Sequence, residues 1–291
     1  MLIDILLISI TLIVLLISSY TDIKTREVPD WLSYAFLTTT VGIRLIFSVE
    51  YGYSILLSGI LGFLICFLLA HLLYYTRQWG GGDSKILMGM GASIGITYPF
   101  TPASFHLLLF FIFLLFVGAI YGLIWMCILA FRNSTLFLKT FKQKLNLHKH
   151  IHYLILSLTL LSLIISLFSP LFWPFVILIL LFFYLLLAVS CIEEHFFHIQ
   201  KPILHLTEGD WLAQTITISN RTLFQPKTLE KSDLIALQKL HSQNKLSAIL
   251  IKEGIPFLPS FLFAYFIILL LTNYPSLFHL ITLFWPRPKE T

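Results

Sequence analysis

Charged side chains are scarce in this sequence, and their scarcity excludes a soluble globular protein. Only 11% of the 291 residues are charged, whereas 58% are hydrophobic and 27 residues are Phe. A soluble domain carries about 25% charged residues. The composition therefore predicts an α-helical polytopic membrane protein that lies in a lipid bilayer.

Cysteine is also rare. Cys66, Cys127 and Cys191 lie far apart and form no C-x-x-C pair, which argues against a zinc site and against a disulfide framework. The first apolar run lacks a basic region before it and a small-residue cleavage site. We therefore expect this run to be a retained membrane span and not a signal peptide.

Long apolar runs predict about eight transmembrane helices. The predicted spans are residues 2–19, 31–48, 53–75, 86–99, 105–131, 151–168, 171–190 and 256–272. They divide the chain into a membrane core (1–131), a basic cytoplasmic loop (132–150), a helical hairpin (151–190), a cytoplasmic α+β insert (191–255) and the last span with a C-terminal tail (256–291).

The insert differs in kind from the rest of the chain, because 14 of its 65 residues are charged. Alternation with β-branched residues predicts a strand at 211–219. Leucines at helical spacing predict a helix at 229–244, with Ser232 as a possible cap. Residues 248–251 suggest a second strand. We therefore expect a small α+β fold outside the bilayer.

One polar stretch, Gly80-Gly81-Gly82-Asp83-Ser84-Lys85, lies between two apolar runs. A carboxylate beside hydrocarbon is costly, so its presence indicates a functional site. The glycines allow a sharp turn and the close approach of another chain. A lone Asp after glycines is more often a helix cap, but a second carboxylate, Asp22, directly follows the first apolar run.

Two carboxylates at the ends of two spans are what an aspartyl protease requires. One can take a proton from water while the other donates a proton to the scissile carbonyl group. Two close carboxylates do not both ionise easily, so the pair should share one proton near neutrality.

The basic residues place both aspartates on one side of the membrane. All 19 Lys and Arg residues except Arg44, Arg287 and Lys289 lie in the loops after the first, third, fifth and seventh spans. Cytoplasmic loops carry the excess of Lys and Arg, so this side is cytoplasmic. Arg44, near the far end of the second span, is expected to reach outward to water.

Three segments then occur in order along the chain. They are Asp22 with Lys24, Arg26 and Val28-Pro29; the Gly80–Lys85 stretch; and Lys252-Glu253-Gly254-Ile255-Pro256-Phe257-Leu258-Pro259. Together they resemble the type IV prepilin peptidases, the G-x-G-D class of membrane aspartyl proteases. The insert before the third segment is most similar to the archaeal prepilin and preflagellin peptidase branch.

The resemblance implies a hydrolase that removes the short basic leader peptide from prepilin or archaellin precursors at the cytoplasmic face of the plasma membrane. It implies that Asp22 and Asp83 are the catalytic pair, and that Gly80 and Gly82 form the turn that presents Asp83. It implies no metal and no organic cofactor. Many bacterial members also methylate the new N-terminus and carry an N-terminal region with paired C-x-x-C motifs, so without such pairs we expect peptidase activity only.

The expected partners are the precursor leader peptides and the lipid bilayer, with no nucleic acid; the oligomeric state stays open. Glu27, Asp30 and Glu253 are candidates for holding the basic leader, although a solvated or capping role is commoner for such residues. Two other functions stay open. A protease similar to presenilin or signal peptide peptidase also has G-x-G-D, but the Pro-Ala-Leu motif is absent here. A transporter would use Asp22 and Asp83 as ion sites, but would be expected to contain inverted repeats.

Overall fold

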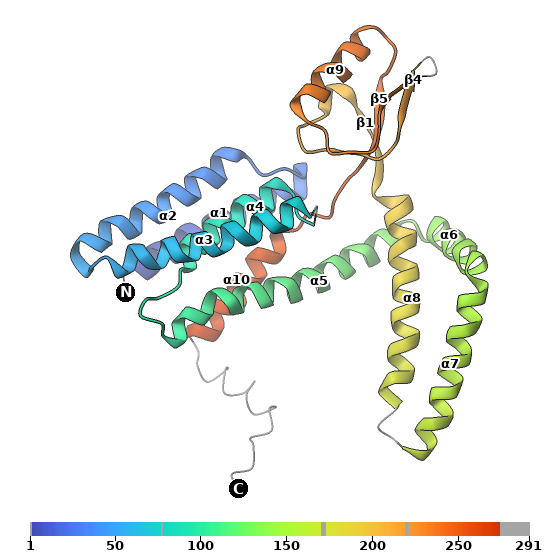
Figure 1. Cartoon of the computed structure of the whole chain (residues 1–291), viewed down its shortest axis with the longest axis horizontal. Coiled ribbons are helices and arrows are strands. Elements are labelled where there is room, and N and C mark those ends of the chain that lie inside the picture. The colour runs from blue at the N-terminus through green and yellow to red at the C-terminus, as the bar shows by residue number, and fades with distance from the viewer. Residues whose placement is uncertain (1, 77, 170–172, 219–220, 274–291) are drawn as a thin grey trace. The chain divides into compact units, whose positions relative to one another are not determined.

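A computed structural model describes residues 2–76, 78–169, 173–218 and 221–273 (Figure 1). The α-helices are α1 (Leu2–Thr25), α2 (Asp30–Tyr51), α3 (Ser54–Tyr75), α4 (Gly81–Ile94), α5 (His106–Arg132), α6 (Ser134–Leu147), α7 (Lys149–Phe168), α8 (Trp173–Phe196), α9 (Lys231–Ser242) and α10 (Leu258–Asn273). Short 3-10 helices are η1 (Pro102–Phe105) and η3 (Ile203–His205). The strands are β1 (His198–Pro202), β2 (Trp211–Leu212), β3 (Ile216–Ile218), β4 (Arg221–Phe224) and β5 (Ala248–Lys252).

Six helices in the described part of the chain are long and apolar enough to cross a membrane: α1, α2, α3, α5 together with η1, α7 and α8. This finding agrees with a polytopic membrane protein, but it does not confirm the predicted count of eight spans. The two other predicted spans correspond to α4, with 14 residues, and α10, with 16 residues. A helix of that length is shorter than the roughly 20 residues that a bilayer core requires. The predicted tail from residue 274 onward lies outside the described residues.

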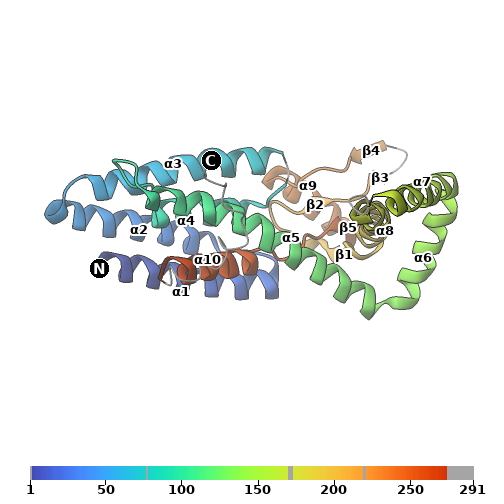
Figure 2. The same ribbon diagram turned by 90° about the horizontal axis from the view of Figure 1, so that it is seen from below.

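The chain divides into two compact units, Met1–Gly122 with Ile255–Thr291, and Leu123–Gly254. In the first unit, α1, α2 and α3 lie alongside one another (Figure 2), and α4 packs against both α2 and α3. The core of this unit contains side chains from α1, α2, α3, α4, α5 and α10. The largest fully buried side chains there include Phe36, Phe110 and Phe261.

Close backbone contact holds α4 against α3. A Cβ atom on Gly91 of α4 would overlap the backbone carbonyl oxygen of Gly62 of α3. In the same way, a Cβ atom on Gly62 would overlap the backbone carbonyl oxygen of Gly91. The two helix backbones therefore approach more closely than any larger residue would allow, which is what small residues at a helix contact make possible.

Arg44 of α2 does not reach outward, so its predicted position was wrong. The residue is only 6% exposed, and its guanidinium group donates hydrogen bonds to carbonyl oxygens at the end of α4. The acceptors are Ala92 (2.8 Å), Ser93 (2.7 Å) and Ile94 (3.2 Å), together with Ile55 of α3 (3.0 Å). The last carbonyl groups of a helix have no partner within it, so Arg44 supplies donors that α4 lacks.

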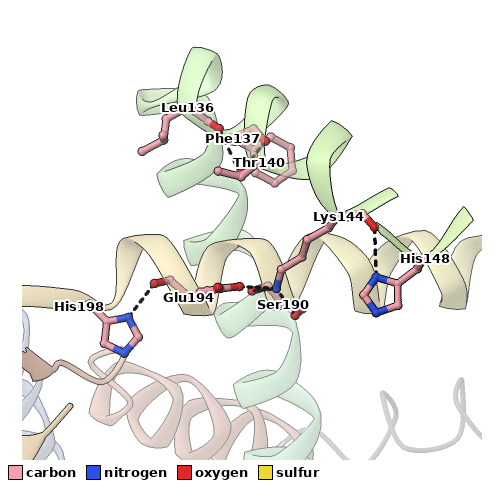
Figure 3. A network of polar contacts seen from close by, with 8 residues as sticks. All are labelled: Leu136, Phe137, Thr140, Lys144, His148, Ser190, Glu194 and His198. Carbon is pink, nitrogen blue, oxygen red and sulfur yellow. Dashed lines mark hydrogen bonds and ion pairs between the residues drawn. The ribbon is translucent and has the colours of Figure 1, made fainter. Parts of the chain in front are cut away.

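The second unit contains a helix where the sequence predicted a basic loop. Residues 134–147 form α6, and Thr140 of α6 is buried. Lys144 of α6 binds Glu194 of α8 at 2.6 Å and donates to the Ser190 hydroxyl group at 2.6 Å, as Figure 3 shows. These contacts attach α6 to the end of α8, and the amphipathic sequence of α6 explains why it folds as a helix.

The α+β insert forms as predicted in type, with different boundaries. Strands β1, β5 and β2 make an antiparallel sheet in that order, and β3 pairs with β4. The predicted strand at 211–219 is two separate strands, β2 and β3, and its last residue lies outside the described residues. The predicted cap at Ser232 is wrong, because Glu230 caps α9 and shares a capping box with Asp233.

Candidate active site

Asp22 lies inside α1 and not in a polar turn after it. The helix continues to Thr25, beyond the predicted end of the first span, and Asp22 is only 8% exposed. Its Oδ2 atom accepts a hydrogen bond of 3.0 Å from the backbone N–H of Leu258, the first residue of α10. A buried carboxylate requires such donors, because water cannot reach it freely.

Asp83 lies in the first turn of α4. Gly80 is the N-cap residue, with φ −72° and ψ 166°, and Gly81 and Gly82 already belong to the helix. The glycines therefore do not form the sharp turn that the sequence suggested, since extended backbone of this kind is open to any residue. Asp83 is presented by a helix start, a position that favours a carboxylate.

A hydrogen bond between the middle of α1 and the end of α4 shows how the two aspartates are brought together. The hydroxyl groups of Thr11 and Ser93 lie 2.5 Å apart. From this pair, Asp22 lies about 16 Å along α1 and Asp83 about 15 Å along α4, at 1.5 Å per residue. Because the charge of Asp22 also acts on Asp83, we infer that the two helices run antiparallel and that both carboxylates reach the same level of the bundle.

The segments around the two aspartates contact each other directly. A Cβ atom on Gly82 would lie 2.8 Å from Cγ2 of Val28, so only glycine leaves room for this valine. Lys85 forms an ion pair of 2.5 Å with Asp30 at the start of α2. Position 82 therefore requires glycine because Val28 approaches it closely. Position 80 has no such requirement, since a Cβ atom on Gly80 would make only ordinary van der Waals contact with Asp83.

The third segment, at the start of α10, completes this arrangement. Besides the bond from Leu258 to Asp22, Phe257 packs against Trp79, with ring centroids 5.3 Å apart. A Cβ atom on Gly118 of α5 would lie 2.6 Å from the Phe257 ring. The three segments recognised in the sequence therefore meet in one place, although the third is far from the others in the chain.

The environment of Asp83 favours its protonated form. Asp83 lies outside the six candidate spans. Desolvation raises the pKa of its carboxyl group to about 7; the negative charge of Asp22 acts in the same direction, and the Gly80 backbone N–H acts against it. A carboxyl group with this pKa holds a proton for much of the time at neutral pH.

Asp30, a candidate for holding the leader peptide, forms an ion pair with Lys85 and is not simply a solvated or capping charge. Within the described ranges, no group of three or more His, Cys, Asp and Glu side chains is placed to hold a metal ion.

Residues 9–128 match the type IV leader peptidase family. The matched region contains both Asp22 and Asp83, so the family resemblance expected from the three segments is confirmed for this part of the chain.

Three archaeal relatives share this similarity. The chain is 40% identical over 88 residues to a preflagellin peptidase of Methanococcus voltae, which covers 30% of this chain and 37% of that protein. It is 38% identical over 82 residues to a preflagellin peptidase of Methanococcus maripaludis, which is 28% of this chain and 35% of that protein. It is 36% identical over 82 residues to a preflagellin peptidase of Methanocaldococcus jannaschii, which is 28% of this chain and 34% of that protein. The aligned part thus spans about a third of these relatives, and no solved structure matches the chain.

Sequence reasoning missed two contributors to the site. The backbone N–H of Leu258 carries no side-chain signal, although the third segment contains it. Trp79, directly before the glycines, packs on both Phe257 and Phe261 of α10. Its place beside the Gly80–Lys85 stretch was the only available signal.

Proposed function

We propose that this protein is a membrane aspartyl endopeptidase that removes the short basic leader peptide from prepilin-like or archaellin precursors. The observation that carries the proposal is the meeting of Asp22 and Asp83 at one level of the helix bundle, inside the region that matches the leader peptidase family. The names of the relatives support a precursor of the archaellin kind.

The proposed chemistry requires one ionised and one protonated carboxyl group. The ionised group takes a proton from water as it attacks the scissile carbonyl carbon, and the protonated group donates its proton to the carbonyl oxygen. The raised pKa of Asp83 supports a shared proton near neutrality. The apolar part of the precursor would lie in the membrane while its basic leader stays in the cytoplasm.

The positions of the basic residues support cleavage at the cytoplasmic face. Lys139 and Lys142 lie on α6, between the candidate spans α5 and α7, and both are exposed. A cysteine in place of Lys142 should be shielded from an impermeant thiol reagent applied to intact cells, whereas one in place of Tyr51 at the end of α2 should be labelled. These tests belong in a background without Cys127, the exposed native cysteine. The opposite labelling pattern would contradict a cytoplasmic site.

The decisive experiment is co-expression with candidate precursors, scored by the mobility shift of the processed product. We expect cleavage of a precursor with a basic leader by the wild-type protein, and no cleavage by Asp83→Asn. The matched control is Glu50→Gln, which neutralises an exposed carboxylate in the last turn of α2. Cleavage that persists with Asp83→Asn would reject the aspartyl mechanism.

We also expect cleavage without methylation of the new N-terminus, because the cysteines of the chain form no C-x-x-C pair. Mass spectrometry of the product should show a free, unmodified amine when this enzyme acts alone. An added methyl group that depends on this chain would disprove this part of the proposal.

A further inference from the structure

The two aspartates receive different numbers of backbone donors. Asp22 accepts a hydrogen bond of 3.0 Å from the N–H of Leu258, and the backbone of Phe257 also bonds to it. Leu258 is the first residue of α10, a helix of 16 residues. The first N–H groups of a helix have no partner within it and carry a partial positive charge, so they stabilise an ionised carboxylate.

Asp83 has fewer such donors. It lies in the first turn of its own helix, α4, and receives one backbone hydrogen bond, from Gly80. The start of α4 also favours the ionised form of Asp83. Among the described residues, however, no N–H group from another helix or strand is bonded to the Asp83 carboxyl group. The balance of donors therefore favours ionisation of Asp22 before that of Asp83.

The charged and titratable groups that act on Asp22 come from three parts of the chain. Arg26 directly follows the last residue of α1, and its positive charge favours ionised Asp22. Asp83 of α4 and Tyr121 of α5 also interact with the Asp22 charge. A carboxylate at Asp83 would repel one at Asp22, so only one of the two readily ionises and the local donors decide which.

We propose that the N-terminus of α10, through the backbone N–H of Leu258, is a positioning element that makes Asp22 the ionised general base and leaves Asp83 as the protonated general acid. This assignment rests on the proposed peptidase function. It also gives the third sequence segment a role in catalysis, because the start of α10 would determine which of the two aspartates is ionised.

The assignment gives a balanced proton path. Asp22 takes a proton from the attacking water, Asp83 donates its proton to the carbonyl oxygen, and a gem-diol forms. The C–N bond then breaks as Asp22 passes its proton to the leaving amine and Asp83 regains a proton from a hydroxyl group of the diol. The products are a carboxylic acid and an amine, and both aspartates return to their starting protonation states.

Two variants at one position separate the N–H group from the leucine side chain. Leu258→Pro removes the N–H at the first helical position, where proline is tolerated. Leu258→Ala also truncates the buried side chain but keeps the N–H group. Both full-length variants would be assayed in detergent for kcat/KM against pH, using a precursor that the wild-type protein cleaves. The acid limb of this profile reports the base, and the alkaline limb reports the acid.

We expect Leu258→Pro to move the acid limb to higher pH by about one unit relative to Leu258→Ala, because the ionised base loses a donor. If Leu258→Pro does not fold, an ester at this position, introduced with the α-hydroxy analogue of leucine, replaces N–H by oxygen and keeps the side chain. The same shift is expected for the ester against the wild-type protein.

Two results would overturn the inference. Unchanged limbs in the proline and ester variants would show that the N–H group does not act on the base. A shift confined to the alkaline limb would make Asp22 the acid. Failure of the proposed function is seen separately, as the absence of cleavage by the wild-type protein before any variant is compared.

Discussion

The guanidinium group of Arg44 donates a 2.8 Å hydrogen bond to the backbone carbonyl oxygen of Ala92. It also bonds to the carbonyl groups of Ser93 and Ile94, and so holds the end of α4 opposite to Asp83. A residue that satisfies several buried carbonyl groups should matter more for stability than its position near the end of α2 suggests.

We therefore expect Arg44→Met to lower the free energy of unfolding by about 2 kcal/mol or more, since each buried acceptor left without a donor is costly. Thermal unfolding of the detergent-solubilised protein would measure this. The matched control is Lys85→Met, which breaks a partly exposed ion pair with Asp30 and should cost under about 1 kcal/mol. Equal losses in the two variants would show that Arg44 does not clamp α4.

The glycine contact between α3 and α4 predicts a strong difference between two alanine substitutions. In Gly91→Ala the new Cβ atom would overlap the carbonyl oxygen of Gly62, which is backbone and cannot move aside cheaply. We expect a loss of about 1–3 kcal/mol. Gly122→Ala has nothing within 4 Å of its Cβ atom and should be neutral or slightly stabilising. Unfolding midpoints for both variants provide the test, and a harmless Gly91→Ala would show that the helices are not so close.

The proposed dyad predicts strong non-additivity. Asp22→Asn and Asp83→Asn should each reduce cleavage at least about a thousandfold, because asparagine keeps the shape but cannot exchange the proton. The double variant should be little worse than either single one, since the two groups act as a unit. Initial rates on one precursor would be compared after equal membrane insertion is verified. Losses that multiply in the double variant would mean independent roles for the two aspartates.

The pKa of Asp83 predicts the behaviour of the enzyme above neutral pH. If Asp83 must donate a proton, activity requires its protonated form, which is lost as the pH rises through about 7. We expect kcat/KM to fall about tenfold for each pH unit above this point. Activity that returns when the pH is lowered again would separate titration from unfolding. A rate that stays constant well above pH 7 would show that protonated Asp83 is not needed.

Composition and the long apolar runs were enough to predict a polytopic membrane protein. Apolar runs report how each segment partitions into lipid, and this property is local, so α1, α2, α3, α5, α7 and α8 were all foreseen. Asp22 and Asp83 stood out for the same reason, because a carboxylate beside an apolar run is conspicuous without any knowledge of the fold. The match of residues 9–128 to the leader peptidase family agrees with this interpretation.

Only the tertiary structure determined the partners of these residues. Asp22 meets the N–H of Leu258, 236 residues away, because α1 and α10 pack together; no local pattern specifies a backbone donor so far along the chain. Arg44 looked like a side chain reaching for water because its sequence position is near a span end, yet the open carbonyl groups of α4 offer it a buried alternative. Hydrophobicity is encoded residue by residue, whereas the pairing of donors with acceptors depends on how the helices pack.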